Sequence, residues 1–151
     1  MRVLRRSHSS AGNDAQELWS SHLLPLSFDS PNEITVASTN YFGSISIFSN
    51  FGTHVEVAAP GERILSGFPG DTLKIADGTS MAAPIVSGVA ALLFSQYPDA
   101  TAAQVKQAIV SSCTPARDLN GRVGCGGIVN APAAQDALAL MLGATQLQQQ
   151  L

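Results

Sequence analysis

The sequence predicts a single α/β domain built around a mostly parallel sheet, and three observations support this fold class. The chain has 151 residues, which is about the length of one domain. Hydrophobic residues make up 45% of it and charged residues only 13%, a composition typical of a chain that buries a core. Short β-branched runs alternate with longer helical segments, the pattern of an α/β domain.

Four short segments are expected to be strands. Glu33–Thr39 and His54–Pro60 are β-branched runs bounded by Asn, Gly and Pro. Arg63–Phe68 and Thr72–Thr79 follow as two more strands, with Pro-Gly-Asp as the turn between them. The stretch before residue 33 has few regular signals and is expected to be loop.

A long apolar helix is expected over Ser80–Tyr97. Its sequence is rich in Ala, Val and Leu on nearly all sides, which predicts a helix that is buried all round. Pro84 is expected in the first turn, where a missing N–H group costs least.

Two further helices are expected towards the C-terminus. The first covers Thr101–Ser112, where Thr101 and Gln104 form a capping box and Val105, Ala108 and Ile109 form an apolar stripe. The second covers Asn130–Leu142. The polar residues 146–151 are expected to fray.

Charge and hydropathy exclude several classes of partner. A net charge of −3 gives no basic field for nucleic acid. The longest apolar run, Met81–Phe94, is too short to span a bilayer, so no membrane span is predicted. The first ten residues contain arginines without an apolar region after them, and no secretory signal is expected there.

The two cysteines, Cys113 and Cys125, are too far apart for a Cys-x-x-Cys motif, and no histidine accompanies them at zinc-finger spacing. Both a disulfide and two free thiols remain open, because the compartment is not known.

The segment "DGTSMAAPIVSG" places Ser80 at the start of the long helix. Free N–H groups and the positive end of the helix dipole would favour negative charge there, and Gly78 would let a substrate approach the backbone. The alternative is that this serine only caps the helix. The nucleophile elbow of α/β hydrolases, Gly-x-Ser-x-Gly, is excluded because "GTSMA" lacks its second glycine.

The string "GTSMAAPIVSGVAALL" closely resembles the nucleophile signature of the subtilisin-like serine proteases, peptidase family S8. Four other segments resemble the same family in the same order. They are "SSAGNDA" (Ser9–Ala15), "PNEITVAST" (31–39), "SNFGTHVEVAAPG" (Ser49–Gly61) and "GCGGIVNAPAAQDAL" (124–138). The five segments are spread over the chain from Ser9 to Leu138.

This resemblance implies a serine endopeptidase acting on polypeptides, with Ser80 as the nucleophile and Asn13 as the side-chain donor of the oxyanion hole. The alternative for Asn13 is a turn asparagine beside Gly12. The family includes calcium-binding members, but no carboxylate cluster here can be assigned to calcium, and no cofactor is expected. Family members are mostly secreted or endomembrane proteins.

The Asp and His of the family's triad precede the oxyanion Asn, but only twelve residues precede Asn13 here. In "FGTHVEVAA" the position of the catalytic histidine is occupied by Phe51, so His54 is interpreted as a strand-start histidine. His22 is assigned to a surface loop near the substrate pocket, and His8 to a place where the family has an apolar strand. The resemblance therefore implies a weak catalyst without its base.

The expected architecture is thus an incomplete subtilisin-like, doubly wound, mostly parallel sheet with flanking helices, whose N-terminal half is absent. Residues 1–9 are an atypical N-terminal segment, 10–142 the C-terminal portion of the catalytic domain and 143–151 a polar tail. Strands at 34–39 and 55–60 are expected to expose an unpaired edge and an apolar face, which would make the chain marginally stable. A non-catalytic binding or scaffolding module is the alternative function.

Overall fold

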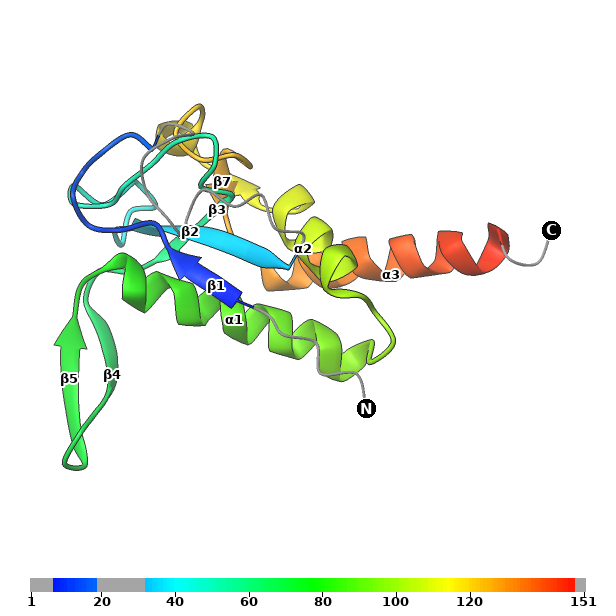
Figure 1. Ribbon diagram of the computed structural model, residues 1–151, viewed down its shortest axis with the longest axis horizontal. Coiled ribbons are helices and arrows are strands. Elements are labelled where there is room, and N and C mark those ends of the chain that lie inside the picture. Colours follow the sequence, from blue (N-terminus) through cyan, green and yellow to red (C-terminus); the bar gives the residue numbers. More distant parts are fainter. Residues whose placement is uncertain (1–6, 19–31, 149–151) are drawn as a thin grey trace.

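A five-stranded sheet forms the centre of the computed structural model, which describes residues 7–18 and 32–148 (Figure 1). The strand order is β1-β2-β3-β7-β6. The strands are β1 (Ser7–Ser10), β2 (Glu33–Thr39), β3 (Val57–Pro60), β6 (Thr114–Pro115) and β7 (Gly127–Ile128). The first four in this order pair in parallel and β6 pairs antiparallel with β7, so the mostly parallel sheet predicted from the sequence is confirmed.

The outer parts of the sheet differ from the sequence prediction. β1 forms where loop was expected, because its backbone pairs with β2 from Ser7↔Glu33 to Ser10↔Val36 although its sequence, Ser-His-Ser-Ser, contains no β-branched residue. β3 begins at Val57, so the prediction that His54 starts this strand is wrong: His54 is exposed in the preceding turn. β2 has the predicted bounds, because the consecutive β-branched residues Ile34, Thr35 and Val36 pack well in a strand between two others.

Three helices pack against one face of the sheet: α1 (Thr79–Gln96), α2 (Ala102–Ser111) and α3 (Ala131–Gln148). Figure 1 shows α1 running beneath β1 and β2, with α3 extending beyond the sheet. The strands contribute Ile34, Val36, Val57 and Ala59 to this core, which are alternate residues and therefore point to the same face. The capping box of Thr101 and Gln104 at the start of α2 is confirmed.

The prediction that the long apolar helix is buried all round is wrong for the described residues. α1 buries one stripe, which includes Ala82, Val86 and Leu93, while Leu92 is 47% exposed. The helix begins at Thr79, so Pro84 lies in its second turn rather than its first. By length and composition α1 could cross a membrane, but here a third of it is buried and it packs on the sheet as a core helix does.

Loops cover the opposite face of the sheet. Ala37 and Ala58 of β2 and β3 pack there with Ala11, Ile45, Val55, Leu119 and Val123, and the short 3-10 helix η1 (Arg117–Leu119) lies in this layer. The expectation of an exposed apolar face and edge at strands 34–39 and 55–60 is therefore wrong. Residues 34–39 and 57–59 are buried, and within the described sheet the edge strands are β1 and β6.

The predicted pair of strands after residue 62 forms an antiparallel hairpin of β4 (Ile64–Phe68) and β5 (Thr72–Ala76). Gly70 and Asp71 have positive φ angles of 80° and 53°, which close the tight turn between them. The hairpin projects away from the sheet and helices (Figure 1). Leu65, Leu73 and Ile75 on it are 61%, 71% and 61% exposed. Exposed apolar side chains therefore occur on this hairpin, whereas the sequence analysis expected them on the central strands.

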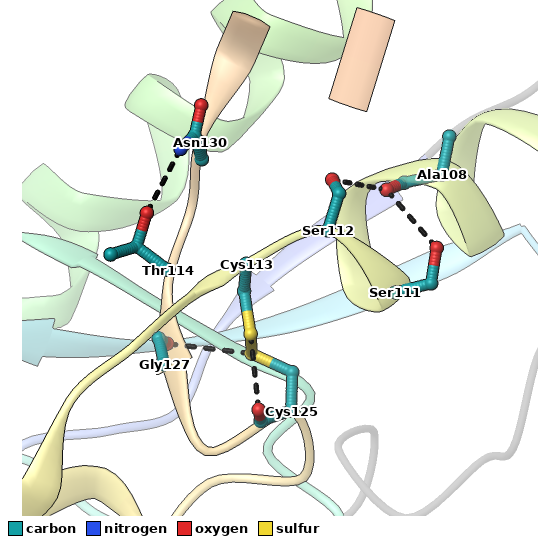
Figure 2. The surroundings of a disulfide bond; sticks show 8 residues. All are labelled: Ala108, Ser111, Ser112, Cys113, Thr114, Cys125, Gly127 and Asn130. Carbon is teal, nitrogen blue, oxygen red and sulfur yellow. Dashed lines mark hydrogen bonds between the residues drawn. A yellow bond between two sulfur atoms is a disulfide. The ribbon is translucent and has the colours of Figure 1, made fainter. Parts of the chain in front are cut away.

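A disulfide joins Cys113 to Cys125, which resolves the alternative that the sequence leaves open. It connects Cys113, two residues after the end of α2, to the segment that leads into β7 (Figure 2). Beside it, the Asn130 amide donates to the Thr114 hydroxyl at 2.9 Å, which ties the start of α3 to β6. α3 continues to Gln148, further than the predicted helix, into the segment that was expected to fray.

Candidate active site

The start of α1 is tied to the carboxyl ends of β2 and β3. Gly78, directly before the helix, donates its N–H to the Gly61 carbonyl at 2.8 Å. The Gly61 N–H donates in turn to the carbonyl of Thr39, the last residue of β2, at 3.0 Å. Gly78 has φ +152°, a conformation that other residues rarely adopt. The helix therefore begins at the sheet edge where parallel α/β folds carry their sites.

Ser80 is the second residue of α1 and is exposed. The Met81 and Ala82 N–H groups donate to the Gly78 carbonyl at 3.0 and 3.3 Å. Within the described part of the chain, neither the Ser80 N–H nor its hydroxyl has a hydrogen-bond partner. Since the N-terminus of a helix carries partial positive charge, this free N–H is available to a bound negative group.

Asn13 lies in the loop after β1, and the structure brings it against the start of α1. Its Oδ1 accepts a hydrogen bond from the Thr79 N–H at 3.0 Å and a second from the Thr79 hydroxyl at 2.9 Å. Its amide nitrogen lies 3.5 Å from the position that a Cβ on Gly78 would occupy. Both sequence-predicted site residues are thus at the same helix terminus, because Thr79 directly precedes Ser80.

Thr79 belongs to this candidate site, although the sequence analysis did not single it out. It is fully buried, and its hydroxyl also accepts a hydrogen bond from the Gly12 N–H at 3.2 Å. One side chain therefore joins the helix to two consecutive residues of the loop that carries Asn13. A β-branched polar residue between Gly78 and Ser80 was the signal that could have indicated it.

Among the described residues no hydrogen bond joins a histidine to Ser80. His54 is exposed in a turn, and His22 lies outside the described residues. His8 belongs to β1, where it pairs in register with Ile34. Asp77 accepts a hydrogen bond from the Arg63 N–H at 2.5 Å, so this carboxylate is engaged with the start of the hairpin.

A hollow of about 660 Å³ lies beside the loops that follow β2 and β3. It is lined by Asn40, Tyr41, Phe42, Pro60, Glu62, Arg63 and Ile64, which include neither Asn13 nor Ser80. Tyr41 and Phe42 are 93% and 87% exposed, and their rings pack edge to face. Among residues 7–18 and 32–148 no group of three His, Cys, Asp or Glu side chains could hold a metal ion.

The sequence of this chain matches the model of the subtilase family over residues 8–127. The chain belongs to the subtilase family. The resemblance inferred from the five sequence segments is thereby confirmed, and members of this family named below are proteases.

Two curated relatives show how much of a subtilase the chain covers. The extracellular protease of Xanthomonas campestris pv. campestris is 41% identical over 137 residues, which are 84% of this chain and 23% of that protein. Subtilisin NAT of Bacillus subtilis subsp. natto is 42% identical over 84 residues, 56% of this chain and 22% of that protein. The chain spans less than a quarter of the length of these relatives.

Solved subtilase structures confirm the fold class. The prenylagaramide maturation protease PagA superposes with a TM-score of 0.75 and 31% identity, covering 89% of this chain and 51% of that one. The subtilase cytotoxin SubAB structure also gives a TM-score of 0.75, at 28% identity, covering 91% of this chain and 50% of that one. The described sheet and helices correspond to about half of these subtilase chains.

Proposed function

We propose that this chain carries the nucleophile and part of the oxyanion hole of a subtilisin-like serine endopeptidase. Ser80 is the nucleophile, Asn13 is the side-chain donor and the substrate is a polypeptide. The observation that carries the proposal is the pair of hydrogen bonds from Thr79 to Asn13 Oδ1, at 3.0 and 2.9 Å. Since the oxygen end of this amide is occupied, its two N–H groups remain available beside the start of α1.

The proposed chemistry uses the free groups at this helix terminus. Ser80 Oγ attacks the carbonyl carbon of a peptide bond, and the carbonyl oxygen becomes negatively charged. The Ser80 N–H and the Asn13 amide donate hydrogen bonds to this oxyanion, and the helix dipole adds favourable potential. Loss of one such donor costs roughly 100- to 1000-fold in rate, a magnitude measured on subtilisin itself.

The reaction also requires a base that takes the proton from Ser80 Oγ and later gives it to the leaving amine. His54 is exposed in a turn, and Phe51 occupies the position of the family's catalytic histidine. The proposal therefore assigns the Asp and His of the triad to no residue of this sequence. The isolated chain is expected to turn over peptides weakly or not at all, because triad members act as a unit.

Secretion or an endomembrane location is proposed for the protein. The Xanthomonas relative is an extracellular protease. The disulfide between Cys113 and Cys125 supports an oxidising compartment, since such bonds are rare in the cytosol.

Labelling of Ser80 by a fluorophosphonate probe tests this proposal, with the modified residue located by mass spectrometry. The probe is added to the chain with and without imidazole, which serves as an external base. We expect imidazole-dependent labelling that disappears in Ser80→Ala and slows about 100-fold in Asn13→Ala. Asn120→Ala, which changes an exposed asparagine outside this site, is the matched control and should label at the unchanged rate.

Absence of labelling in both arms would overturn the proposal and leave a protease-like binding or scaffolding module. A second outcome concerns the base. Peptide hydrolysis by the isolated chain that is lost in Ser80→Ala would contradict the proposal that no residue of this sequence supplies the base. That result would show that the base lies within this sequence.

A further inference from the structure

Asn50 is buried, 1% exposed, in the connection between β2 and β3, and it contacts the loop that carries Asn13. Its side-chain amide donates to the Ala11 carbonyl at 3.0 Å. Its Oδ1 accepts hydrogen bonds from the Asp14 and Gln16 N–H groups at 3.0 and 2.9 Å. Its own backbone N–H donates to the Gly12 carbonyl at 2.9 Å. One residue thus binds the loop on both sides of Asn13.

The backbone of this loop needs such support. Gly12 and Ala15 flank the Asn13–Asp14 pair with positive φ angles of 98° and 53°, and the second is an uncommon conformation for alanine. A Cβ on Gly12 would lie 2.5 Å from the Asn50 amide nitrogen. Glycine at position 12 therefore leaves the space that the Asn50 side chain occupies.

Asn50 is itself anchored to an interior strand. The Ser49 hydroxyl accepts a hydrogen bond from the Ser38 N–H of β2 at 3.0 Å and donates to the Asn50 carbonyl at 2.9 Å. The Ser38 and Ser46 hydroxyls are hydrogen-bonded at 2.8 Å, and the Ser46 N–H donates to the Ser38 carbonyl at 2.9 Å. Since these residues are buried, the position of Asn50 is set by β2.

We propose that Asn50 is a positioning residue that sets the direction of the Asn13 amide. This inference rests on the proposed function, in which that amide is an oxyanion donor. Thr79 holds Asn13 from the side of α1, and Asn50 holds the same loop from the side of β2. Without the Asn50 amide, the Asp14 and Gln16 N–H groups turn to solvent and the loop no longer presents Asn13 in one orientation.

NMR of the full ¹⁵N-labelled chain tests the positioning role. In Asn50→Ala we expect amide hydrogen exchange of Asp14 and Gln16 to accelerate at least about tenfold, and the two side-chain amide protons of Asn13 to move towards random-coil shifts. Asn50→Asp keeps an acceptor for both N–H groups but loses the donor to the Ala11 carbonyl, so it should restore only part of the protection. If Asn50→Ala does not fold, Asn50→Ser provides the same comparison, because its hydroxyl is too short to hold both N–H groups.

Val105→Ala is the matched control, since Val105 is 2% exposed in the core on the opposite face of the sheet. It lowers global stability but should leave the Asn13 side-chain signals unchanged. The inference is overturned if these signals keep their shifts in folded Asn50→Ala, or if Val105→Ala moves them equally.

Ser80 labelling of the same variants separates this inference from the proposed function. Asn50→Ala should label at least about tenfold more slowly than the wild type. The double variant Asn13→Ala/Asn50→Ala should label no more slowly than Asn13→Ala, because both changes remove the same donor. An unlabelled wild type with a loosened loop in Asn50→Ala overturns the function and supports the positioning. Full-rate labelling of Asn50→Ala with unchanged NMR signals overturns the positioning alone.

Discussion

Asn13 Oδ1 accepts two hydrogen bonds from Thr79, one from its backbone N–H and one from its hydroxyl, although 66 residues separate them in the chain. The N-cap residue of α1, Gly78, has no side chain that could satisfy the first N–H group of the helix. Asn13 satisfies it from another segment. The helix terminus and the loop after β1 therefore form one unit.

Replacing Thr79 by valine should destabilise the chain by about 1–3 kcal/mol. The valine has no hydroxyl, so the buried hydrogen bonds to Asn13 Oδ1 and from the Gly12 N–H are both lost. Thr79→Ser keeps the hydroxyl and should cost less. Urea unfolding of both variants measures the difference. Equal stability of the valine variant and the wild type would show that these hydrogen bonds contribute no net stability.

The Glu56 side chain connects β2 to α2, and its removal should lower stability more than the loss of its charge alone. Its Oε2 accepts the Thr35 N–H of β2 at 2.7 Å, and its Oε1 pairs with Lys106 of α2. Glu56→Gln retains an oxygen for Thr35 and loses only the ion pair, for a cost of about 1 kcal/mol or less. Glu56→Ala also leaves the Thr35 N–H unsatisfied, at about 1–3 kcal/mol.

Denaturant unfolding at low and high salt checks this order. The loss in Glu56→Gln should shrink at high salt, because ions screen a partly exposed pair. The loss of the backbone hydrogen bond in Glu56→Ala should persist. A glutamine variant as unstable as the alanine variant would contradict the role of the Thr35 contact.

Removing the disulfide should lower the free energy of unfolding by about 3 kcal/mol, since Cys113 and Cys125 close a loop with a sequence separation of 12. The measurement is thermal unfolding of the wild type with and without reductant, beside the Cys113→Ser/Cys125→Ser variant. Reductant should destabilise the wild type to the level of the variant and leave the variant unchanged. A reductant effect on the variant would point to another cause.

The apolar side chains of the β4–β5 hairpin should drive self-association of the isolated chain. Leu65 and Ile75 are paired in register, and with Leu73 they form an exposed apolar group on a projecting hairpin. The triple variant Leu65→Ser/Leu73→Ser/Ile75→Thr should bind less of the dye 8-anilinonaphthalene-1-sulfonate and should show a larger monomer fraction in light scattering. Unfolding free energy should change little, because these side chains are already in water.

Leu140→Ser is the control for that experiment, since Leu140 is 75% exposed on α3, away from the hairpin. It should leave self-association unchanged. A triple variant that associates as strongly as the wild type would exclude the hairpin as the association surface.

Local chemistry was sufficient to predict several elements of this fold. The β-branched run of β2, the capping box of Thr101 and Gln104 and the hairpin turn all depend on residues close together in the chain. β1 was missed because its four polar residues become a strand only through pairing with β2. The burial of α1 was misjudged for a similar reason: composition shows that a helix is apolar, but not how many of its sides another element covers.

By itself, the sequence determined the subtilase family and placed Ser80 at a helix start, because both depend on contiguous residues. Only the tertiary structure decided that Thr79 binds Asn13, that Asn50 holds the loop around it and that the two cysteines are joined. Each of these contacts joins segments that are distant in the chain. Their formation depends on how the sheet brings its loops together, and no local pattern of residues specifies that arrangement.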